Sequence, residues 1–571
     1  MPRLRIVLSL LAACLVATAA ATPAHAHPGE ERDRLRLYDD GGVMARAAQA
    51  PSAAATPRAD CGPGSRKETD IQGRVPAGSD QGFICNMTQV GEDGATGGYK
   101  ALRFVDKAGR ECAYYDTTLL FPLNALSLSE GMTGVAVLDM SNPAKPVRTT
   151  TLSTPAMQTP HESVNLNQKR GLLAAVTGNP AFYPGIVDIY DLNEDCRKPV
   201  LQSSLPVGVL GHESGFAPDG NTFYTTSIGS GQVTALDVSD PKAPKILTVF
   251  ESNSHGLTVG DDGNRAYIAA SQGLVILDTS EIQQRKPNPK VREVSRLAWP
   301  ELTIPQIAIP VKIGGKPYVV EVDEFSQDRQ GSTTGNGEVV GAARIIDISD
   351  ETKPRVVSNI RLEVNQPENR AKIAKDPGTQ SPVQGYAGHY CNVPRRDEPG
   401  IFACSFILSG LRVFDIRDAL KPKEIAYFVA PPAPSPGTGE KTNYAMSQPT
   451  FVPERDEIWY TDGNSGFYAL RLAKTASSMA DKPAAGSPTT LPSARSCASR
   501  RNFRIRLRRG LVSARVTVNA KRVRVIRGKR LRAPVDLRGL PRGRFTVRVT
   551  GRLRNGRTIT ARRAYRTCVQ S

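Results

Sequence analysis

Residues 231–247, GQVTALDVSDPKAPKIL, join a short apolar strand to a proline-containing polar turn and a second apolar segment. The same phrase recurs at residues 134–147, 185–200, 273–291, 341–357 and 410–425, and a degenerate copy, GFYALRLAK, occupies residues 466–474. In the six full copies an Asp directly follows the apolar run, at Asp139, Asp191, Asp237, Asp278, Asp347 and Asp415. Such a carboxylate can accept hydrogen bonds from backbone N–H groups two residues further on. We therefore interpret these acids as turn-forming rather than catalytic.

Two further strand-like segments separate successive copies, and the turn sequences PDGN (residues 218–221) and DDGN (residues 261–264) lie between them. Each unit thus predicts four antiparallel strands, and units repeated at roughly 40–60 residues indicate an all-β fold, the β-propeller. Seven copies predict seven blades, with six or eight as alternatives because one unit carries long insertions. The last copy ends at its third strand, near Leu472, so FICNMTQVGE, which starts at Phe83, is expected to supply the fourth.

The repeated phrase resembles the LVIVD repeat of bacterial secreted propeller proteins, from about Phe83 to Leu472. This resemblance implies a propeller over residues 81–473 and no particular activity, because a fold alone does not determine function.

The two ends of the chain differ in composition from the repeats. Residues 1–26 have the basic start, apolar stretch and Ala-His-Ala ending of a secretory signal peptide, with a lipoprotein signal ending at Cys14 as the alternative. Residues 27–80 are rich in Ala, Pro and charge, and we expect them to be disordered. Residues 474–496 form a Ser/Pro/Ala linker. We therefore expect a secreted protein, extracellular or associated with the cell envelope.

Eight cysteines follow the predicted signal peptide, and export favours disulfides. We predict a Cys391–Cys404 pair between successive strands and a Cys497–Cys568 pair that brackets the C-terminal domain. Three connectivities remain open for Cys61, Cys85, Cys112 and Cys196.

The C-terminal segment, residues 497–571, carries most of the excess charge. It holds 24 of the 74 Lys and Arg residues but one of the 55 acidic residues, so its net charge is +23 and that of residues 1–496 is −4. Apolar and basic residues alternate with period two, which predicts a small β-sandwich. It resembles the Ig-like modules of secreted actinobacterial proteins. Such a surface is expected to bind an anionic cell-envelope polymer or a membrane surface. The segment lacks the interleaved aromatic residues that stack on bases, so sequence-specific nucleic-acid binding is not expected.

Histidines recur at the start of the first strand of a repeat, where a propeller lines its central channel. The four are His161, His212, His255 and His389, and Gln306 and Gln448 align with them in two other units. Imidazole is the commonest protein ligand of transition metals, so the histidines predict a site for Cu, Zn or Fe. Glu162 and Glu213 follow a His directly, and regular strand alternation would place them behind the histidines or between blades. The alternative is that these histidines are structural residues copied with the repeat.

Two functions follow from this pattern. The first is a secreted, envelope-associated propeller that binds a small ligand, a metal ion or a protein partner at a His-lined channel. The second is a metal-dependent oxidoreductase or hydrolase that uses the same histidines. Propellers of the selenium-binding and methanethiol oxidase type are similar in having a His-lined metal site, but their longer signatures do not occur here. The insertions over residues 324–341 and 365–388 are expected to cover one face, and Glu321, Asp323 and Glu324 stand at the start of the first.

Overall fold

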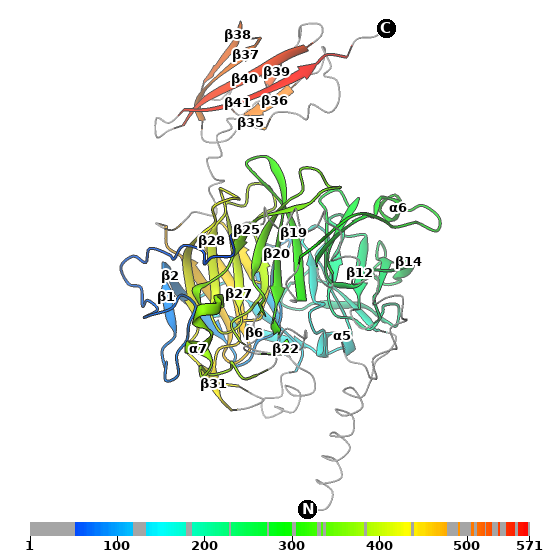
Figure 1. Ribbon diagram of the computed structural model, residues 1–571. Coiled ribbons are helices and arrows are strands. Elements are labelled where there is room, and N and C mark those ends of the chain that lie inside the picture. Colours follow the sequence, from blue (N-terminus) through cyan, green and yellow to red (C-terminus); the bar gives the residue numbers. More distant parts are fainter. Residues whose placement is uncertain are drawn as a thin grey trace, which may run out of the picture. The chain divides into compact units, whose positions relative to one another are not determined.

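The computed structural model describes the chain from residue 52 to residue 568, with gaps. The described ranges are 52–117, 133–178, 185–227, 230–270, 273–299, 304–327, 333–334, 339–381, 385–435, 439–474, 476, 489–490, 504–507, 511–519, 521–527, 531, 535–536, 544–553 and 558–568. Strands dominate these ranges, and the helices are single turns (Figure 1). The predicted all-β class is confirmed.

Most strands fall into consecutive antiparallel groups of four. The first three groups are β3 (Ala101–Val105), β4 (Glu111–Asp116), β5 (Val135–Asp139) and β6 (Val147–Leu152); β7 (Asn165–Asn167), β8 (Leu172–Val176), β9 (Val187–Asp191) and β10 (Val200–Leu205); and β11 (Ser214–Phe216), β12 (Thr222–Thr226), β13 (Gln232–Asp237) and β14 (Lys245–Glu251).

The next groups follow the same order. They are β15 (Ser254–Val259), β16 (Arg265–Ala270), β17 (Gly273–Asp278) and β18 (Arg292–Ala298); β19 (Ile304–Ile313), β20 (Lys316–Glu324), β24 (Ala343–Asp347) and β25 (Arg355–Ile360); and β26 (Gly388–Asn392), β27 (Ile401–Phe406), β28 (Gly410–Asp415) and β29 (Lys423–Val429). A single parallel bridge between Glu324 and Gly388 joins the β20 and β26 groups into one larger sheet. The last group combines β32 (Thr450–Val452), β33 (Glu457–Asp462) and β34 (Gly466–Leu472) with β2 (Met87–Asp93), from the other end of the chain.

The strand β2 pairs antiparallel with β34, from Met87 opposite Leu472 to Asp93 opposite Phe467. The predicted closing strand was expected to begin at Phe83, but β1 (Phe83–Cys85) adds to β29 of the preceding sheet instead. Asn86, between the two strands, has a positive φ of 53°. Its amide donates to the backbone carbonyl of Ile425. This left-handed turn redirects the chain from one sheet to the next.

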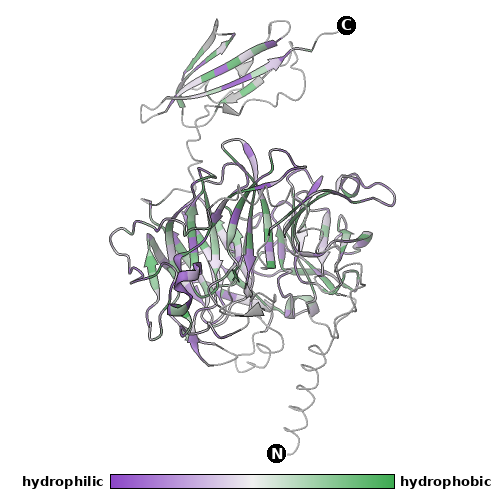
Figure 2. Cartoon of the chain, in the orientation of Figure 1, coloured by the Kyte–Doolittle hydropathy of each residue, from purple (hydrophilic) through white to green (hydrophobic). Residues whose placement is uncertain are grey.

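Neighbouring sheets pack face to face, which explains why the strands are continuous apolar runs rather than alternating ones. Strand β17, GLVILD, is buried except at its terminal Asp. Figure 2 shows hydrophobic residues along the strands. Trp459 and Phe467 of the last group pack with Tyr115 and Leu138 of the first, so the series of sheets closes on itself. This closed order of four-stranded sheets is a β-propeller.

The repeat aspartates have the predicted hydrogen bonds. Each accepts from the backbone N–H two residues further on, as Asp237 does from Ser239 at 2.9 Å. The other five do the same. They close the turn between the third and fourth strands of a blade.

Three disulfides lie in the propeller and its N-terminal extension. The predicted Cys391–Cys404 pair is present between β26 and β27. The four cysteines left open form Cys61–Cys85 and Cys112–Cys196. Cys568 is disulfide-bonded, and Cys497 lies outside the described residues.

Residues 54–80 lie against the propeller, unlike the disordered segment expected over residues 27–80. Ile71 and Val75 are buried. The Thr56 backbone N–H donates to the carbonyl of Arg361 at 2.8 Å. The side-chain amide of Gln72 donates to Glu424 at 2.9 Å. A few apolar anchors and these polar contacts order a segment whose overall composition is polar.

Short elements occur in the segments that connect the main strands. They are α5 (Pro155–Gln158), α6 (Ser280–Gln283), α7 (Arg370–Ile373), η3 (Glu363–Asn365), η4 (Pro367–Asn369), β21 (Ser326–Gln327), β22 (Thr333–Thr334), β23 (Val339–Val340), β30 (Ala433–Pro434) and β31 (Lys441–Thr442). Among the helices that the structure describes, none is long and apolar enough to cross a membrane.

The C-terminal residues form two sheets. One consists of β35 (Thr489–Thr490), β36 (Arg504–Leu507) and β39 (Val535–Asp536). The other has the order β38 (Lys521–Arg527), β37 (Leu511–Val518), β40 (Arg544–Leu553) and β41 (Thr558–Arg566). A core of buried side chains that includes Val516, Val547 and Tyr565 packs between them.

Candidate metal centre

The four repeat histidines come from inner strands or from the residues just before them. His255 lies in β15 and His389 in β26, while His161 and His212 precede β7 and β11. Inner strands of successive sheets touch, from β7 to β11, β15, β19 and β26. This contact order brings side chains more than 200 residues apart in sequence into one cluster.

Two of the imidazole rings are oriented by backbone carbonyls. Nδ1 of His255 lies 2.8 Å from the carbonyl oxygen of Pro305, and Nδ1 of His389 lies 2.6 Å from that of Met446. A carbonyl only accepts hydrogen bonds, so Nδ1 must carry the proton in both rings. In the neutral rings Nε2 therefore presents its lone pair to the centre, the arrangement by which proteins orient metal-ligating histidines.

The carboxylates of Glu162 and Glu324 face the ring nitrogens. His389 Nε2 lies 3.2 Å from Glu162 Oε1 and 3.1 Å from Glu324 Oε2. His255 Nε2 lies 3.3 Å from Glu324 Oε1, and His212 Nε2 lies 3.2 Å from Glu162 Oε2. Nε2 of His212 lies 2.5 Å from Nε2 of His255. Each of these nitrogen and oxygen atoms therefore lies within about one hydrogen-bond length of another atom that could bind a metal.

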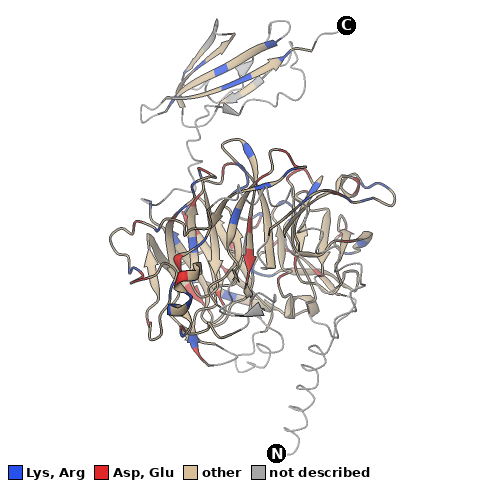
Figure 3. Ribbon diagram, viewed as in Figure 1, with Lys and Arg blue, Asp and Glu red and all other residues tan. Residues whose placement is uncertain are grey.

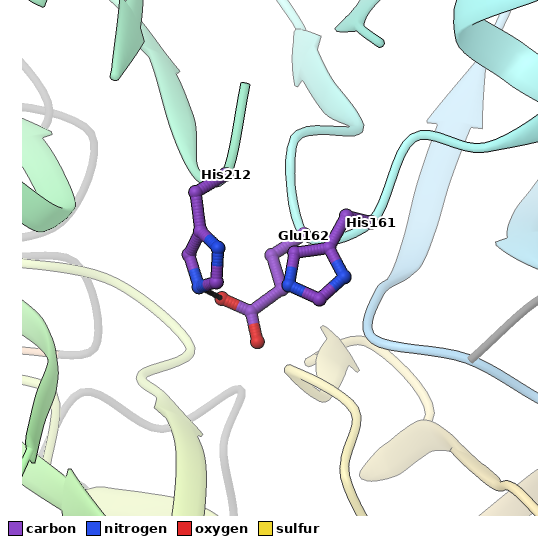
Figure 4. A group of neighbouring side chains, drawn as sticks. All are labelled: His161, Glu162 and His212. Carbon is purple, nitrogen blue, oxygen red and sulfur yellow. Dashed lines mark ion pairs between the residues drawn. The ribbon is translucent and has the colours of Figure 1, made fainter. Parts of the chain in front are cut away.

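His161 and His212 flank the Glu162 carboxylate, and Figure 4 shows that carboxylate directed between the two rings. The ring centroids of His161 and His212 are 4.3 Å apart, and that of His161 is 4.9 Å from Tyr99. The His212 side chain is 19% exposed, whereas those of His255 and His389 are 2% and 0% exposed. The cluster is thus buried on one side and reaches solvent at His212.

Burial and mutual charge set the protonation of this cluster. Burial and the neighbouring His212 lower the pKa of His161 and of His255 to about 3, which leaves both rings neutral. Burial also lowers the pKa of His389, but Glu162 and Glu324 outweigh it and raise that pKa to about 9. Burial raises the pKa of Glu324. Burial acts in the same direction on Glu162, but His212 and His389 outweigh it and lower its pKa. Without a metal, protons must supply the positive charge that these carboxylates require.

A hydrogen-bonded network supports the cluster from behind. The Tyr390 hydroxyl lies 3.1 Å from Glu162 Oε2 and also contacts Glu213. Since a phenol has one proton, it can donate to one carboxylate at a time. Burial raises the pKa of Glu213, so that carboxyl can carry the second proton. Lys100 Nζ pairs with Glu213 at 2.9 Å, and the side-chain amide of Gln306 donates to Glu162.

The structure places the predicted site residues at different depths. His161, His212, His255 and His389 converge, and Gln306 joins them through Glu162. Gln448, which aligns with the histidines, donates its backbone N–H to the Tyr99 carbonyl. Glu213 lies behind the ring of histidines, bonded to Lys100 and Tyr390. Glu162 lies among the ring nitrogens themselves, because His161 has a positive φ of 52° and the alternation of a regular strand does not apply there.

Sequence reasoning did not assign Glu324 and Tyr390 to the cluster. Glu324 is the last residue of β20, where the first long insertion begins. Tyr390 occupies the position that Glu holds in the two His-Glu units. Its place directly after a repeat histidine was the feature of the sequence that could have assigned Tyr390 to the cluster.

Chemically, the cluster offers imidazole nitrogens and carboxylate oxygens from buried, oriented side chains. Two overlapping groups, His161/Glu162/His212 and Glu162/Glu324/His389, each hold their donor atoms within 4.8 Å of one another. Donors bound to one metal at about 2.0–2.2 Å lie roughly 3 Å apart, so these residues could hold a metal ion.

Comparisons with known proteins agree with the repeat and add no activity. The LVIVD repeat family matches residues 261–282. A protein of unknown function from Desulfotomaculum acetoxidans is 13% identical, with a TM-score of 0.40, covering 63% of this chain and 94% of that one. Kuenenia stuttgartiensis hydrazine synthase is 14% identical, with a TM-score of 0.37, covering 57% and 79%. A Lactobacillus plantarum protein is 9% identical, with a TM-score of 0.39, covering 60% and 96%. No match was found among curated proteins. At these identities no property of the three proteins transfers to this chain.

Proposed function

We propose that this chain is a secreted, seven-bladed β-propeller that binds a divalent transition-metal ion at the centre of its ring. The proposed ligands are His212, His255, His389, Glu162 and Glu324. One observation carries the proposal: three imidazole Nε2 atoms each lie within 3.1–3.3 Å of a Glu162 or Glu324 oxygen, and carbonyl acceptors fix two of the rings in the orientation that a ligand requires.

A metal cation would satisfy these converging nitrogen and oxygen atoms together. His389 Nε2 is buried and close to two carboxylates, yet it forms no well-aligned hydrogen bond with either. In the neutral form of that ring, with its proton on Nδ1, the Nε2 lone pair faces two negative oxygens; the raised pKa of about 9 means that without a metal a second proton takes this place. A metal ion between them removes this repulsion and satisfies the nitrogens and the oxygens together.

The donor set favours particular metals. Imidazole with carboxylate suits Zn, Cu and Fe, whereas sites selective for softer ions use thiolates. The described cysteines are all in disulfides, so they supply no thiolate. The disulfides are compatible with an oxidising compartment, which supports the proposed secretion.

Metal titration tests this proposal. The full chain is stripped with a chelator and titrated with Zn²⁺ and Co²⁺ against a chromophoric competitor. We expect one ion per chain. We expect His389→Ala and His212→Ala each to weaken binding by more than about a hundredfold, because loss of the groups that merely orient a ligand already costs 10–100-fold.

Gln448→Ala provides the matched control, since it changes an aligned inner-strand position whose side chain is not among the proposed ligands. It should bind metal like the parent protein. Less than one ion per chain in the parent protein, or equal affinities of the parent and His389→Ala, would overturn the metal site.

A metal-dependent oxidoreductase or hydrolase is the second candidate function. The 19% exposure of the His212 side chain favours it, because catalytic metal sites keep a position open to solvent. Azide added to the Co²⁺ protein tests this openness. A shifted visible spectrum supports an accessible coordination position, and an unchanged spectrum indicates a closed, structural site.

A further inference from the structure

The sheet β38-β37-β40-β41 in the C-terminal segment has two chemically opposite faces. Side chains such as Phe545, Val547 and Val549 alternate into the core. The opposite face carries exposed arginines, which we call the arginine face: Arg515, Arg527, Arg544, Arg548, Arg552, Arg562 and Arg566. Figure 3 shows basic and no acidic residues on these strands. The alternation therefore separates a packing face from a cationic one.

The strand register places like charges directly opposite each other. Arg544 pairs with Arg566, and Arg548 pairs with Arg562, across β40 and β41. Directly opposed side chains have Cβ atoms about 4.5–5.5 Å apart, and like charges at this distance destabilise a sheet. The four strands contain no Asp or Glu that could neutralise them. An anion bound between the guanidinium groups would remove this repulsion.

Exposed arginines of the propeller are arranged differently. Arg292, Arg296, Arg355 and Arg417 are each more than half exposed, and each pairs with a neighbouring carboxylate. Arginine in this chain is thus neutralised locally on the propeller surface but collected without acids on one sheet of the C-terminal segment. This difference indicates that the arginines of the C-terminal sheet bind an anion from outside the chain.

We propose that the arginine face binds a linear polymer that carries phosphate groups along its length. The planar guanidinium group of Arg binds two phosphate oxygens at once, which the point charge of Lys does not. Along β40, Arg544, Arg548 and Arg552 recur every four residues, about 14 Å apart, and threonines occupy the positions between them. The face thus offers a row of bidentate donors with hydroxyl groups in between.

The geometry favours a flexible chain over a bilayer or a nucleic acid. Neighbouring strands turn by roughly 20–25°, so a flexible polymer can follow the face more completely than a planar membrane can. Proteins that lie on membranes also insert aromatic or other apolar side chains. Here Phe545 and Tyr565 stack on each other in the core, 5.5 Å apart, so neither can anchor in lipid or stack on a base.

Binding of the full chain to long-chain inorganic polyphosphate tests the proposal. The dissociation constant is measured over a salt series, with polyglutamate and vesicles of equal parts phosphatidylglycerol and phosphatidylcholine as competing probes. Seven phosphate contacts predict a slope of log affinity against log salt of about −5. The tightest binding should be to polyphosphate. Salt-independent binding, or equal or tighter binding to polyglutamate or the vesicles, would overturn the proposal.

Matched charge variants separate the arginine face from total charge. Gln at Arg544, Arg548, Arg562 and Arg566 should reduce the slope to about −2 and weaken binding more than tenfold. Gln at Arg292, Arg296, Arg355 and Arg417 removes the same charge from the propeller and should leave binding unchanged. Lys at the first four positions should restore the slope but only part of the affinity, which also shows that the sheet folds. Equal losses in the two Gln variants would show that total charge, not this face, binds the polymer. The metal site takes no part in this measurement, so either proposal can fail alone.

Discussion

Removing the carboxylate of Glu213 or the ammonium group of Lys100 leaves the other charge buried behind the histidine cluster. The two side chains are each 1% exposed and pair at 2.9 Å across the inner strands of separate blades. Lys100 Nζ also lies 4.1 Å from the centre of the Tyr390 ring. Little water can reach a charge that loses its partner here. We therefore predict strong, non-additive effects on stability.

The magnitude follows from the burial of both groups. Removing one partner of a buried pair costs about 3–5 kcal/mol, whereas replacing both by neutral groups of similar volume is often close to neutral. Glu213→Gln and Lys100→Met should each cost about 3–5 kcal/mol, and the double variant should cost less than either single variant. Burial raises the pKa of Glu213. Lys100→Met should therefore lose less stability at acidic than at alkaline pH, because the orphaned carboxyl can take up a proton.

Urea unfolding followed by tryptophan fluorescence measures this cycle. Trp299 and Trp459 are the chain's two tryptophans, and both are buried in the propeller, so the signal reports propeller unfolding alone. If the double variant loses the sum of the two single losses, the charges are not coupled and the reasoning is refuted.

Three further predictions concern the propeller scaffold. Opening the Cys112–Cys196 disulfide by a double Ala substitution should cost about 4–5 kcal/mol of unfolding free energy, because it closes a loop of 84 residues; a loss near zero in urea unfolding would contradict this. Gly256→Ala would place a Cβ 1.9 Å from a backbone oxygen of β19, so it should lower stability by at least about 1–3 kcal/mol, while Gly260→Ala, with ordinary contacts, serves as the control. Burial raises the pKa of Asp116 from 3.8 to about 7. The raised pKa makes its stabilising contribution complete below about pH 4 and lost as pH rises through 7. The urea midpoint should consequently fall between pH 5 and pH 8 in the parent protein and fall less in Asp116→Asn; equal pH dependence in the two proteins would refute this assignment.

The repeat made the architecture of the propeller predictable. Apolar strands followed by an Asp-closed turn recur because each blade needs the same strand ends, and this signal is local in sequence. The closing strand was placed less accurately. Phe83–Cys85 and Met87–Asp93 follow each other as one strand-like stretch, but the left-handed Asn86 divides it between two sheets. Nothing in the apolar pattern marks that division.

The histidine positions were predictable because equivalent blade positions meet at the axis. The carboxylates were harder to predict. Glu162 enters the cluster because the backbone at His161 is left-handed, a conformation that a non-glycine residue rarely adopts. Glu324 enters from the end of β20, opposite Ile304 across the strand pair, in a blade that has no histidine. Contacts across the axis depend on how the blades close, and composition carries no information about them.

Anomalous X-ray diffraction from crystals of the metal-loaded full chain tests the central claim most directly. Data collected on either side of the absorption edge of the added ion should give one strong anomalous peak in the propeller. We predict that this peak lies within bonding distance, about 2.0–2.2 Å, of Nε2 of His212, His255 and His389 and of a Glu162 or Glu324 oxygen. A peak elsewhere, or no peak in crystals grown with the ion, would contradict a metal centre at the propeller axis.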